Sequence, residues 1–458
     1  MPIIVGIISQ KYLLVGVTMD KNLIMQILSD WNFWKKDLPC GIGREGYIEK
    51  LKTLMPTGQI IVITGPRRAG KSFVMRQLVH KLISGVVQRE NILMINFEDP
   101  RFENLDAGLL QRIYETYLEY LRPSSKPYIF LDEVQEVEDW EKWVRTAHEL
   151  NKATIILSGS NAKLLSRELS TLLTGRHIDL SVFPLSFAEY LFFNEIDISG
   201  PLDLVDKKIE LSRAINDFLE FGSFPLTVIS DEKKEILLSY YDDVINKDLI
   251  RRFKVRKPAD LKALARFYLS NTSSLVTFNS IEKFLKVSAD TIDKFSGYLE
   301  EAYLIFLTKR FSFKVKEQEK SPRKVYVVDT GLANIVGFKS SPNKGRLAET
   351  VVFLELARMR AKGPEIEIYY WKDERHKEVD FVIMSGSKVS SLIQVCWDVQ
   401  APETKNRELK ALLKAMNEFH LNEGIVISED YEAIEDYEGK KIIFIPLYKW
   451  LLKHQLPA

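Results

Sequence analysis

The sequence predicts an α/β protein whose core is a parallel sheet. Between about Asp20 and Pro201, short apolar runs alternate with helical stretches, and this alternation is typical of a parallel α/β sheet. The apolar runs are Ile60–Thr64, Ile92–Phe97, Tyr128–Leu131 and Thr154–Ser158. Helical periodicity dominates from there to about Phe311, and strands mix with helices again from Val325 onward. We therefore expect an α/β core, a helical middle and a second α/β region.

The bulk composition limits the possible partners. The chain has 458 residues, of which 46% are hydrophobic and 28% charged, as in ordinary globular proteins. At roughly 100–200 residues per domain, this length predicts about two to four domains. The formal net charge is only +1, so any nucleic-acid surface must be a local patch. The two cysteines, Cys40 and Cys396, argue against a disulfide framework and favour a reducing compartment.

The first eighteen residues, MPIIVGIISQKYLLVGVT, are apolar but interrupted by polar side chains. This stretch is too short to span a bilayer and lacks the basic leader of a signal peptide. Two interpretations stand equally: an early strand, or residues that precede a natural start at Met19. We expect no membrane partner and a cytoplasmic location.

The strongest motif is a phosphate-binding loop. The stretch IIVITGPRRAGKSF contains a full match to GxxxxGK[ST], with an apolar strand before it and the amphipathic stretch Phe73–Leu82 after it. Glycines let the backbone N–H groups wrap a polyphosphate, and the helix N-terminus adds a positive dipole end. We expect Lys71 to reach the β- and γ-phosphates of ATP and the Ser72 hydroxyl to bind Mg²⁺. A chance match in an unrelated loop would lack the flanking strand and helix.

Two carboxylates follow the strand Tyr128–Leu131. Ligands of parallel sheets bind at the C-terminal ends of the strands, where Asp132 and Glu133 are expected. We expect Asp132 to hold the Mg²⁺ shell and Glu133 to orient or activate the attacking water. The alternative is a solvated acidic turn, which the position after a phosphate loop disfavours.

Two further residues are candidates for catalysis. After the strand Thr154–Ser158, either Ser160 or Asn161 is placed to sense the γ-phosphate or position the water. Arg176 precedes the strand Ile178–Val182, at a surface edge. It would act either as an arginine finger in the ATP site of a neighbouring subunit or as half of a surface salt bridge.

The ordered set GPRRAGKS, YIFLDEVQ, ILSGSN, LTGR and VFPLSFAEYL resembles the archaeal and bacterial AAA+ ATPases often called DExx-box ATPases. Gly222–Pro225 resembles the glycine-x-proline element of their helical lid, and Gly43-Arg44-Glu45 resembles their motif near the nucleotide base. The resemblance runs from about Leu38 to Lys410. It implies an ATP-dependent machine that forms homo-oligomers, including rings. The residues expected to bind the nucleotide are Gly65, Pro66, Arg67, Arg68, Ala69, Gly70, Lys71, Ser72, Phe73 and Arg44.

The middle segment resembles a winged helix-turn-helix. A helix candidate at Thr277–Leu285 is followed by a turn and by a second candidate at Ala289–Ala302, with Ser288 as N-cap. Basic residues gather on both sides, within residues 247–257 and 309–320, and such clusters suit contact with the DNA backbone. The second helix candidate carries Asp290 and Asp293, which would repel a duplex, so we expect backbone binding without base reading. A winged helix used only for protein packing is the alternative.

The C-terminal region resembles a PD-(D/E)xK restriction-endonuclease fold. The matching residues are Glu349, Glu378, Asp380 and Gln394, whereas Cys396 stands where the pattern has lysine. A missing anionic ligand weakens a hard-cation site, and a missing lysine removes a group that helps activate water. We therefore expect a nuclease shape that no longer cuts.

These observations predict four parts: an extension over 1–37, an AAA+-like core over 38–200, a helical lid and winged helix over 201–330, and a nuclease-like domain over 331–458. The predicted function is ATP hydrolysis with Mg²⁺, coupled to binding or remodelling DNA, including branched or junction DNA in recombination or repair. Two other functions remain open: a nucleotide-dependent switch acting on a protein partner, and an ATP-dependent nuclease.

Overall fold

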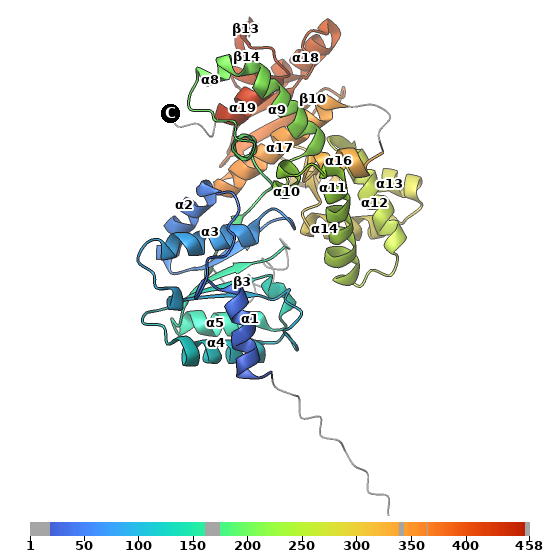
Figure 1. Cartoon of the computed structure of the whole chain (residues 1–458). Helices are drawn as coiled ribbons and strands as arrows, with labels where there is room; N and C mark the ends of the chain where they lie inside the picture. The colour runs from blue at the N-terminus through green and yellow to red at the C-terminus, as the bar shows by residue number, and fades with distance from the viewer. Residues whose placement is uncertain (1–18, 161–174, 339–342, 364, 454–458) are drawn as a thin grey trace, which may run out of the picture.

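A computed structural model describes residues 19–160, 175–338, 343–363 and 365–453 of the chain. The predicted catalytic residue Asn161 and the stretch before Met19 lie outside these residues. Figure 1 shows the core sheet with α1, α4 and α5 at one end of the molecule and the C-terminal elements at the other. No described helix combines the length and the apolar character needed to cross a membrane.

The core is a five-stranded parallel sheet, as the sequence predicts. Its strands are β1 (Ile60–Thr64), β2 (Ile92–Asn96), β3 (Tyr128–Asp132), β4 (Thr154–Ser158) and β5 (His177–Ser181). They follow the order β2-β3-β4-β1-β5, and every neighbouring pair is parallel. The C-terminal ends of β1, β3 and β4 therefore meet at one edge of the sheet, where their polar residues come together.

Helices cover both faces of this sheet. One face packs against α2 (Glu45–Leu54) and α3 (Lys71–Ile83), with Ile61 and Ile63 of β1 pointing toward them. The other packs against α1 (Lys21–Trp31), α4 (Ala107–Leu121) and α5 (Trp140–Glu149), with Ile60 and Val62 on that side. The 3₁₀ turns η1 (Met55–Thr57), η2 (Arg89–Asn91) and η3 (Val134–Glu136) lie between these elements. Alternate residues of β1 thus enter two separate cores, as strand geometry requires.

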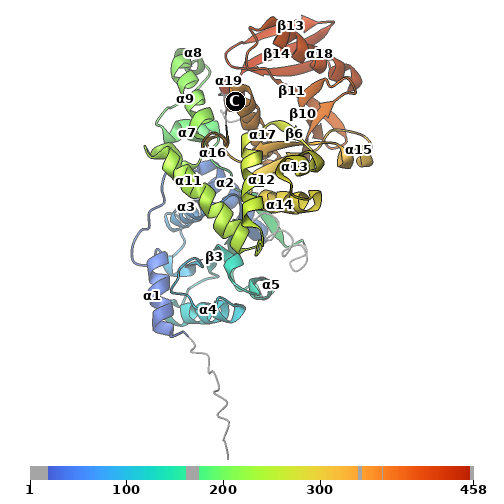
Figure 2. The ribbon, with the colours of Figure 1, turned by 90° about the vertical axis from the view of Figure 1, so that its right-hand side faces the viewer.

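A helical region follows the sheet. It contains α7 (Phe187–Phe193), α8 (Asp203–Asp206), α9 (Lys208–Phe221), α10 (Pro225–Ile229) and α11 (Lys233–Asp243). A π-helical segment, η4 (Val244–Arg251), continues α11 without a break. Figure 2 shows α11 descending from this region toward the core sheet.

The next elements form a compact unit of helices and short strands. They are α12 (Pro258–Ser270), β6 (Ser274–Val276), α13 (Phe278–Leu285), α14 (Ala289–Glu301), β7 (Ile305–Thr308), α15 (Val315–Lys320) and β8 (Arg323–Val327). The three strands pair antiparallel in the order β6-β8-β7. Helix α15 forms within the polar stretch Lys314–Arg323. Ser288 does occupy the N-cap position of α14, although its hydroxyl bonds Thr291 rather than a backbone N–H.

The last region builds a mixed six-stranded sheet. After α16 (Thr330–Val336) and α17 (Lys344–Lys362) come β9 (Ile366–Lys372), β10 (Glu378–Ser385), β11 (Lys388–Val395), α18 (Pro402–Glu418), β12 (Glu423–Ser428), β13 (Ala433–Tyr437), β14 (Lys440–Pro446) and α19 (Leu447–Lys453). The strand order is β13-β14-β12-β11-β10-β9. Strands β10 and β11 pair antiparallel as a hairpin.

One helix ties this second sheet to the rest of the molecule. Most of the residues of α17 are buried, and they share one apolar core with α9, α11, α14 and the second sheet. Arg358 of α17 donates hydrogen bonds to the carbonyls of Pro184 and Leu185, just beyond β5. The helical middle and the second sheet are therefore packed together as one body.

Candidate active site

The phosphate loop lies between β1 and α3, at the C-terminal edge of the sheet. Gly65 and Gly70 have positive φ angles of 139° and 97°. A Cβ on Gly65 would lie 2.0 Å from the carbonyl oxygen of Val182, so no larger residue fits there. The glycines of the motif thus have a steric cause as well as a conformational one.

Lys71 is buried inside this loop. Its Nζ donates to the carbonyl oxygens of Gly65 at 3.0 Å and Pro66 at 3.1 Å, and lies 3.9 Å from a carboxylate oxygen of Glu133. The side chain is only 4% exposed. An ammonium enclosed by the loop is placed to meet phosphate oxygens in the same loop.

Asp132 ends β3 and meets two hydroxyl groups. Ser158 of β4 donates a hydrogen bond to it, and Ser72 lies close enough to lower its pKa. Burial and the neighbouring Glu133 nevertheless raise the pKa of Asp132 above its ordinary value. A cation beside Asp132 would oppose both effects, and Ser72 and Asp132 together offer the oxygen ligands that Mg²⁺ prefers.

Glu133 has an unusual backbone and a charged side chain. Its φ of 53° places it in the left-handed region, which is costly for a residue other than glycine and occurs at functional sites. Burial acts to raise the pKa of Glu133, but Lys71, Gln135 and Arg67 outweigh it and lower the pKa. Glu133 is therefore ionised at neutral pH, as a residue that accepts a proton from water must be.

Ser160 adds a buried hydroxyl to the same edge. Within the described residues its Oγ has no hydrogen-bond partner of ordinary geometry, although it lies close enough to Glu133 to help stabilise that carboxylate. A buried hydroxyl without a partner is uncommon, and a bound phosphate or water would satisfy it. The residues present thus fit a nucleotide with its metal ion.

The two loop arginines contact the helical region, which sequence reasoning missed. Arg67 Nε lies 2.9 Å from Asp248 of η4, and its terminal nitrogen lies 2.9 Å from Glu98. Arg68 lies 3.2 Å from Asp243, the last residue of α11. Nothing in the sequence signals the pairs with Asp248 and Asp243, because their members are separated by more than 170 positions.

Arg44 is placed differently from the expected contact with the nucleotide base. It is buried, and its guanidinium forms a bidentate pair with Glu189, with both nitrogen–oxygen distances 2.8 Å. It also donates to the carbonyls of Ala69, at 2.9 Å, and Phe183. Arg44 therefore stabilises the phosphate loop through the carbonyl of Ala69. Phe73, in contrast, is 44% exposed just after the loop.

Arg176 lies at the opposite edge of the sheet from the phosphate loop. Its carbonyl accepts a hydrogen bond from the N–H of Ile60, at the beginning of β1, whereas the loop follows the end of that strand. Its side chain is half exposed and paired with Glu149. It cannot reach the phosphate loop of its own chain, and a role in a neighbouring subunit stays a prediction.

The predicted lid element lies over the loop. The ring of Pro225 is 3.9 Å from the place where a Cβ of Gly70 would be. Asp329 holds this element in position, since it accepts a hydrogen bond from the N–H of Ser223 at 2.6 Å. Burial raises the pKa of Asp329 to about 6.

The C-terminal residues of the nuclease-like pattern also converge, but on a lysine. Lys324 of β8 is fully buried, and its Nζ lies 2.7 Å from Glu349, 2.8 Å from Glu378 and 2.8 Å from Asp380. Tyr326, two residues further along β8, donates to Glu349 at 2.7 Å. Sequence reasoning missed both residues, although a lysine inside the apolar strand RKVYVV was a signal.

The other two positions of this pattern are also engaged. Gln394 accepts a hydrogen bond from the N–H of Asp380 and donates one to Glu408. Burial raises the pKa of Cys396 to about 11, so it is a neutral thiol. Within the described part of the chain, no group of three or more His, Cys, Asp or Glu side chains is arranged to hold a metal ion.

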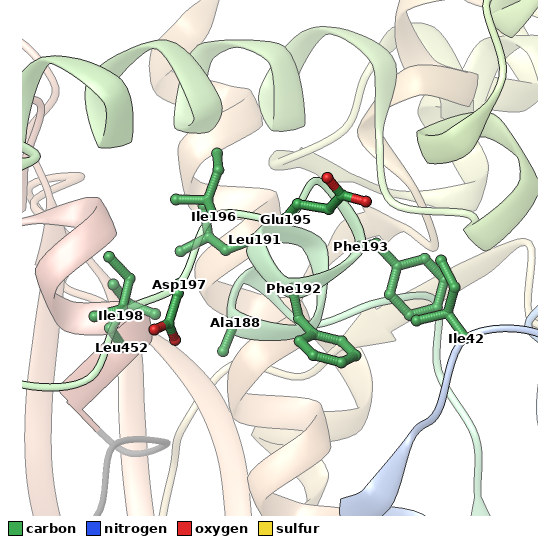
Figure 3. A pocket seen from close by; sticks show the side chains of 10 residues that line it. All are labelled: Ile42, Ala188, Leu191, Phe192, Phe193, Glu195, Ile196, Asp197, Ile198 and Leu452. Atoms are coloured by element: carbon green, nitrogen blue, oxygen red, sulfur yellow. The ribbon is translucent and has the colours of Figure 1, made fainter.

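A separate hollow of about 620 Å³ lies beside α7, and none of its lining residues belongs to the phosphate loop. Figure 3 shows Phe193 next to Ile42 at one end and Leu452 next to Ile198 at the other. Its charged lining residues are Glu195 and Asp197, both acidic. Two acidic side chains repel a phosphate, so this hollow is a poorer candidate for a nucleotide site than the phosphate loop.

Three parts of the chain match known family models. A family model described as an AAA domain matches residues 57–191, which include the phosphate loop, Asp132 and Glu133. Two further models, each described as a domain of unknown function, match residues 212–342 and 344–450. Residues 57–191 therefore form a P-loop ATPase domain of the AAA type.

Two relatives match this chain over nearly its whole length. An uncharacterized protein of Methanocaldococcus jannaschii is 33% identical over 98% of this chain and 100% of its own length. An uncharacterized protein of Haemophilus influenzae is 31% identical over 90% of this chain and 99% of its own. The chain belongs to the family of these archaeal and bacterial proteins.

Solved structures that resemble part of this chain include the Walker-type ATPase paby2304 of Pyrococcus abyssi. It is 14% identical, with a TM-score of 0.43 over 67% of this chain and 99% of that one. AMPPCP-bound DnaA from Aquifex aeolicus is 15% identical, with a TM-score of 0.30 over 59% of this chain and 93% of that one.

Proposed function

We propose that this protein hydrolyses ATP with Mg²⁺ and uses the cycle to bind or remodel DNA, including branched or junction DNA in recombination or repair. The observation that carries the ATPase part is the convergence of Lys71, Ser72, Asp132 and Glu133 at one edge of the sheet. These four side chains come from β1–α3 and β3, and they lie together around one loop.

Each residue has a distinct role in this proposal. Lys71 binds the β- and γ-phosphates, and Ser72 and Asp132 hold Mg²⁺, which neutralises charge on the phosphates. Glu133, ionised in its charged surroundings, orients the attacking water and accepts its proton. Arg176 acts across an oligomer interface on the ATP of a neighbouring subunit, as an arginine finger does.

The DNA part of the proposal rests on the first basic cluster. Arg251, Lys254, Arg256 and Lys257 have no ion pair among the described residues, and all four are exposed. The second cluster is partly neutralised, because Lys309 and Lys314 pair with Glu319 and Glu317, whereas Lys316 and Lys320 have no ion pair among the described residues. The unpaired cluster at 251–257 is therefore the stronger candidate for backbone phosphates.

The helices α12–α14 with strands β6–β8 support a winged helix in the predicted third part of the chain. Asp290 and Asp293 of α14 are exposed, which agrees with backbone binding without base reading. We propose that the fourth part keeps a nuclease shape without cutting. Lys324 fills the space among Glu349, Glu378 and Asp380, and it is too deeply buried to meet a substrate.

Steady-state ATP hydrolysis with and without duplex, single-stranded and four-way junction DNA tests the proposal, with Glu133→Gln as control. We expect one DNA form to stimulate turnover and the control to be silent. Turnover that is indifferent to every DNA would contradict the DNA part and favour a switch that acts on a protein partner. Nicking with Mg²⁺ or Mn²⁺ that disappears in Asp380→Ala would contradict the inactive nuclease.

A further inference from the structure

The phosphate loop and the helical region are joined by four charged residues, which we name the arginine clasp: Arg67, Arg68, Asp243 and Asp248. Arg67 binds Asp248 through two nitrogens, at 2.9 Å and 3.2 Å, and Arg68 binds Asp243 at 3.2 Å. The Arg68 guanidinium also lies over the ring of Tyr240, 5.5 Å from its centre. Two adjacent loop residues thus hold two carboxylates of one continuous helix.

The π-helical segment explains how one helix presents both carboxylates. Asp243 and Asp248 are five positions apart. In an α-helix, with 3.6 residues per turn, such residues point about 140° apart. A π-helix closes its hydrogen bonds from residue i to i+5, so residues five apart lie roughly one turn above each other. The π-helical form of η4 (Val244–Arg251) therefore lets Asp243 and Asp248 face the loop arginines together.

The clasp also joins the loop to the unpaired basic cluster. Asp248 lies three and four positions before Arg251 and Arg252, and Lys247 pairs with Asp243 itself. Any displacement of η4 must move these basic side chains. The P-loop ATPase site and the proposed DNA contact are thus connected through a few residues.

A bound triphosphate competes with the clasp. The loop wraps the phosphates, so the side chains of Arg67 and Arg68 begin within reach of phosphate oxygens. A guanidinium binds phosphate in a bidentate way, and a polyphosphate carries more charge than a single carboxylate. Asp248 is 6% exposed, and burial raises its pKa. The charged form of Asp248 therefore depends on Arg67 as its partner. Loss of Arg67 would leave Asp248 buried without a partner, which is unfavourable enough to displace η4.

We propose that the arginine clasp is a nucleotide-sensitive latch: a bound triphosphate draws Arg67 and Arg68 away from Asp248 and Asp243, and η4 with its basic residues is released. This inference rests on the proposed function, and it adds the route by which the nucleotide reaches the basic cluster. ADP, which lacks the γ-phosphate, releases the latch less.

Hydrogen exchange of the amides of residues 244–251 tests the latch, with ATPγS or ADP added to the full chain. Binding of the nucleotide is followed separately with a fluorescent analogue of ATP. Asp248→Asn and Asp243→Asn each weaken the clasp from the helix side. Asp242→Asn is the matched control, because Asp242 is an exposed neighbour in the same helix and does not contact the loop arginines.

We expect ATPγS to speed exchange in this segment at least tenfold in the natural protein and in Asp242→Asn. Asp248→Asn should exchange fast without nucleotide and bind the analogue about tenfold more tightly, because Arg67 then keeps only its exposed pair with Glu98. If the analogue binds but exchange of residues 244–251 does not change, the latch is wrong while the ATPase proposal stands. If the analogue does not bind at all, the ATPase proposal itself fails. If Asp248→Asn loses its fold, Asp243→Asn decides by the same two measurements.

Discussion

At the scale of single residues, charge balance explains the C-terminal cluster. Burial and Asp380 raise the pKa of Glu349 from 4.5 to about 8, so Glu349 keeps its proton at neutral pH. The remaining charges then cancel, because Lys324 and Lys372 face Glu378 and Asp380. A balanced set of charges tolerates burial, whereas a single unpaired charge does not.

This balance predicts an unusual pH dependence. Between its ordinary pKa of 4.5 and its folded pKa of about 8, Glu349 binds a proton in the folded state and not in the unfolded state. The contribution of Glu349 to stability is therefore complete below pH 4.5 and declines as the pH rises toward 8. Glu349→Gln, which mimics the protonated form, should remove a slope of about 1 kcal/mol per pH unit over this range.

Urea unfolding from pH 5 to 8 measures the slope in the natural protein, in Glu349→Gln and in Glu374→Gln. Glu374 is an exposed glutamate of the same region and serves as the control. An unchanged slope in Glu349→Gln would mean that Glu349 is ionised in the folded protein.

Some of the residues at these two sites could be predicted from the sequence, and others could not. Lys71, Ser72, Asp132 and Glu133 could be singled out because local patterns next to strands mark them. Lys324 could not, because its three carboxylate partners come from elements that only the folded chain brings together. Arg44 follows its family motif, but the sequence does not show that Glu189 takes its guanidinium.

At the scale of elements, apolar or amphipathic runs were predictable, whereas polar or very short elements were not. The core strands and α3 carry their signal in consecutive residues. The strands β6 and β7 have three and four residues, and they exist because β8 pairs with both. Helix α15 has six residues and lies in a stretch that reads as a polar loop.

The joint between α9 and the lid element depends on one glycine. Gly222 has a φ of 79°, and a Cβ there would lie 2.1 Å from a carboxylate oxygen of Asp329. Gly222→Ala should therefore lower the free energy of unfolding by more than about 2 kcal/mol, through strain and through displacement of a buried carboxylate. Gly297 provides the contrast, because it lies in α14 with open space around it, and Gly297→Ala should raise stability by about 0.5–1 kcal/mol.

Thermal and urea unfolding of both variants measure this difference. Nucleotide binding should weaken in Gly222→Ala, because Asp329 positions Ser223 and Pro225 over the phosphate loop. Equal stability of the two variants would contradict the close contact between Gly222 and Asp329.

At the scale of the whole molecule, ion pairs decide which basic residues are available. Both basic clusters have a similar composition, so the sequence could not rank them. The structure separates them in part, because Glu317 and Glu319 pair with Lys314 and Lys309 of the second cluster, whereas no carboxylate pairs with Arg251 or Lys254 among the described residues.

This difference predicts how salt affects DNA binding. Log affinity falls with log salt concentration, and each phosphate contact that is lost makes this negative slope shallower by about one. The double variant Arg251→Gln, Lys254→Gln should make the slope shallower by about two. The double variant Lys309→Gln, Lys314→Gln should change the slope by less than one. Both variants remove two charges, so net charge cannot explain a difference between them. Anisotropy of a labelled duplex between about 50 and 200 mM salt gives both slopes. Equal losses in the two variants would show that Glu317 and Glu319 do not neutralise the second cluster, and the DNA contact would then have to include both clusters.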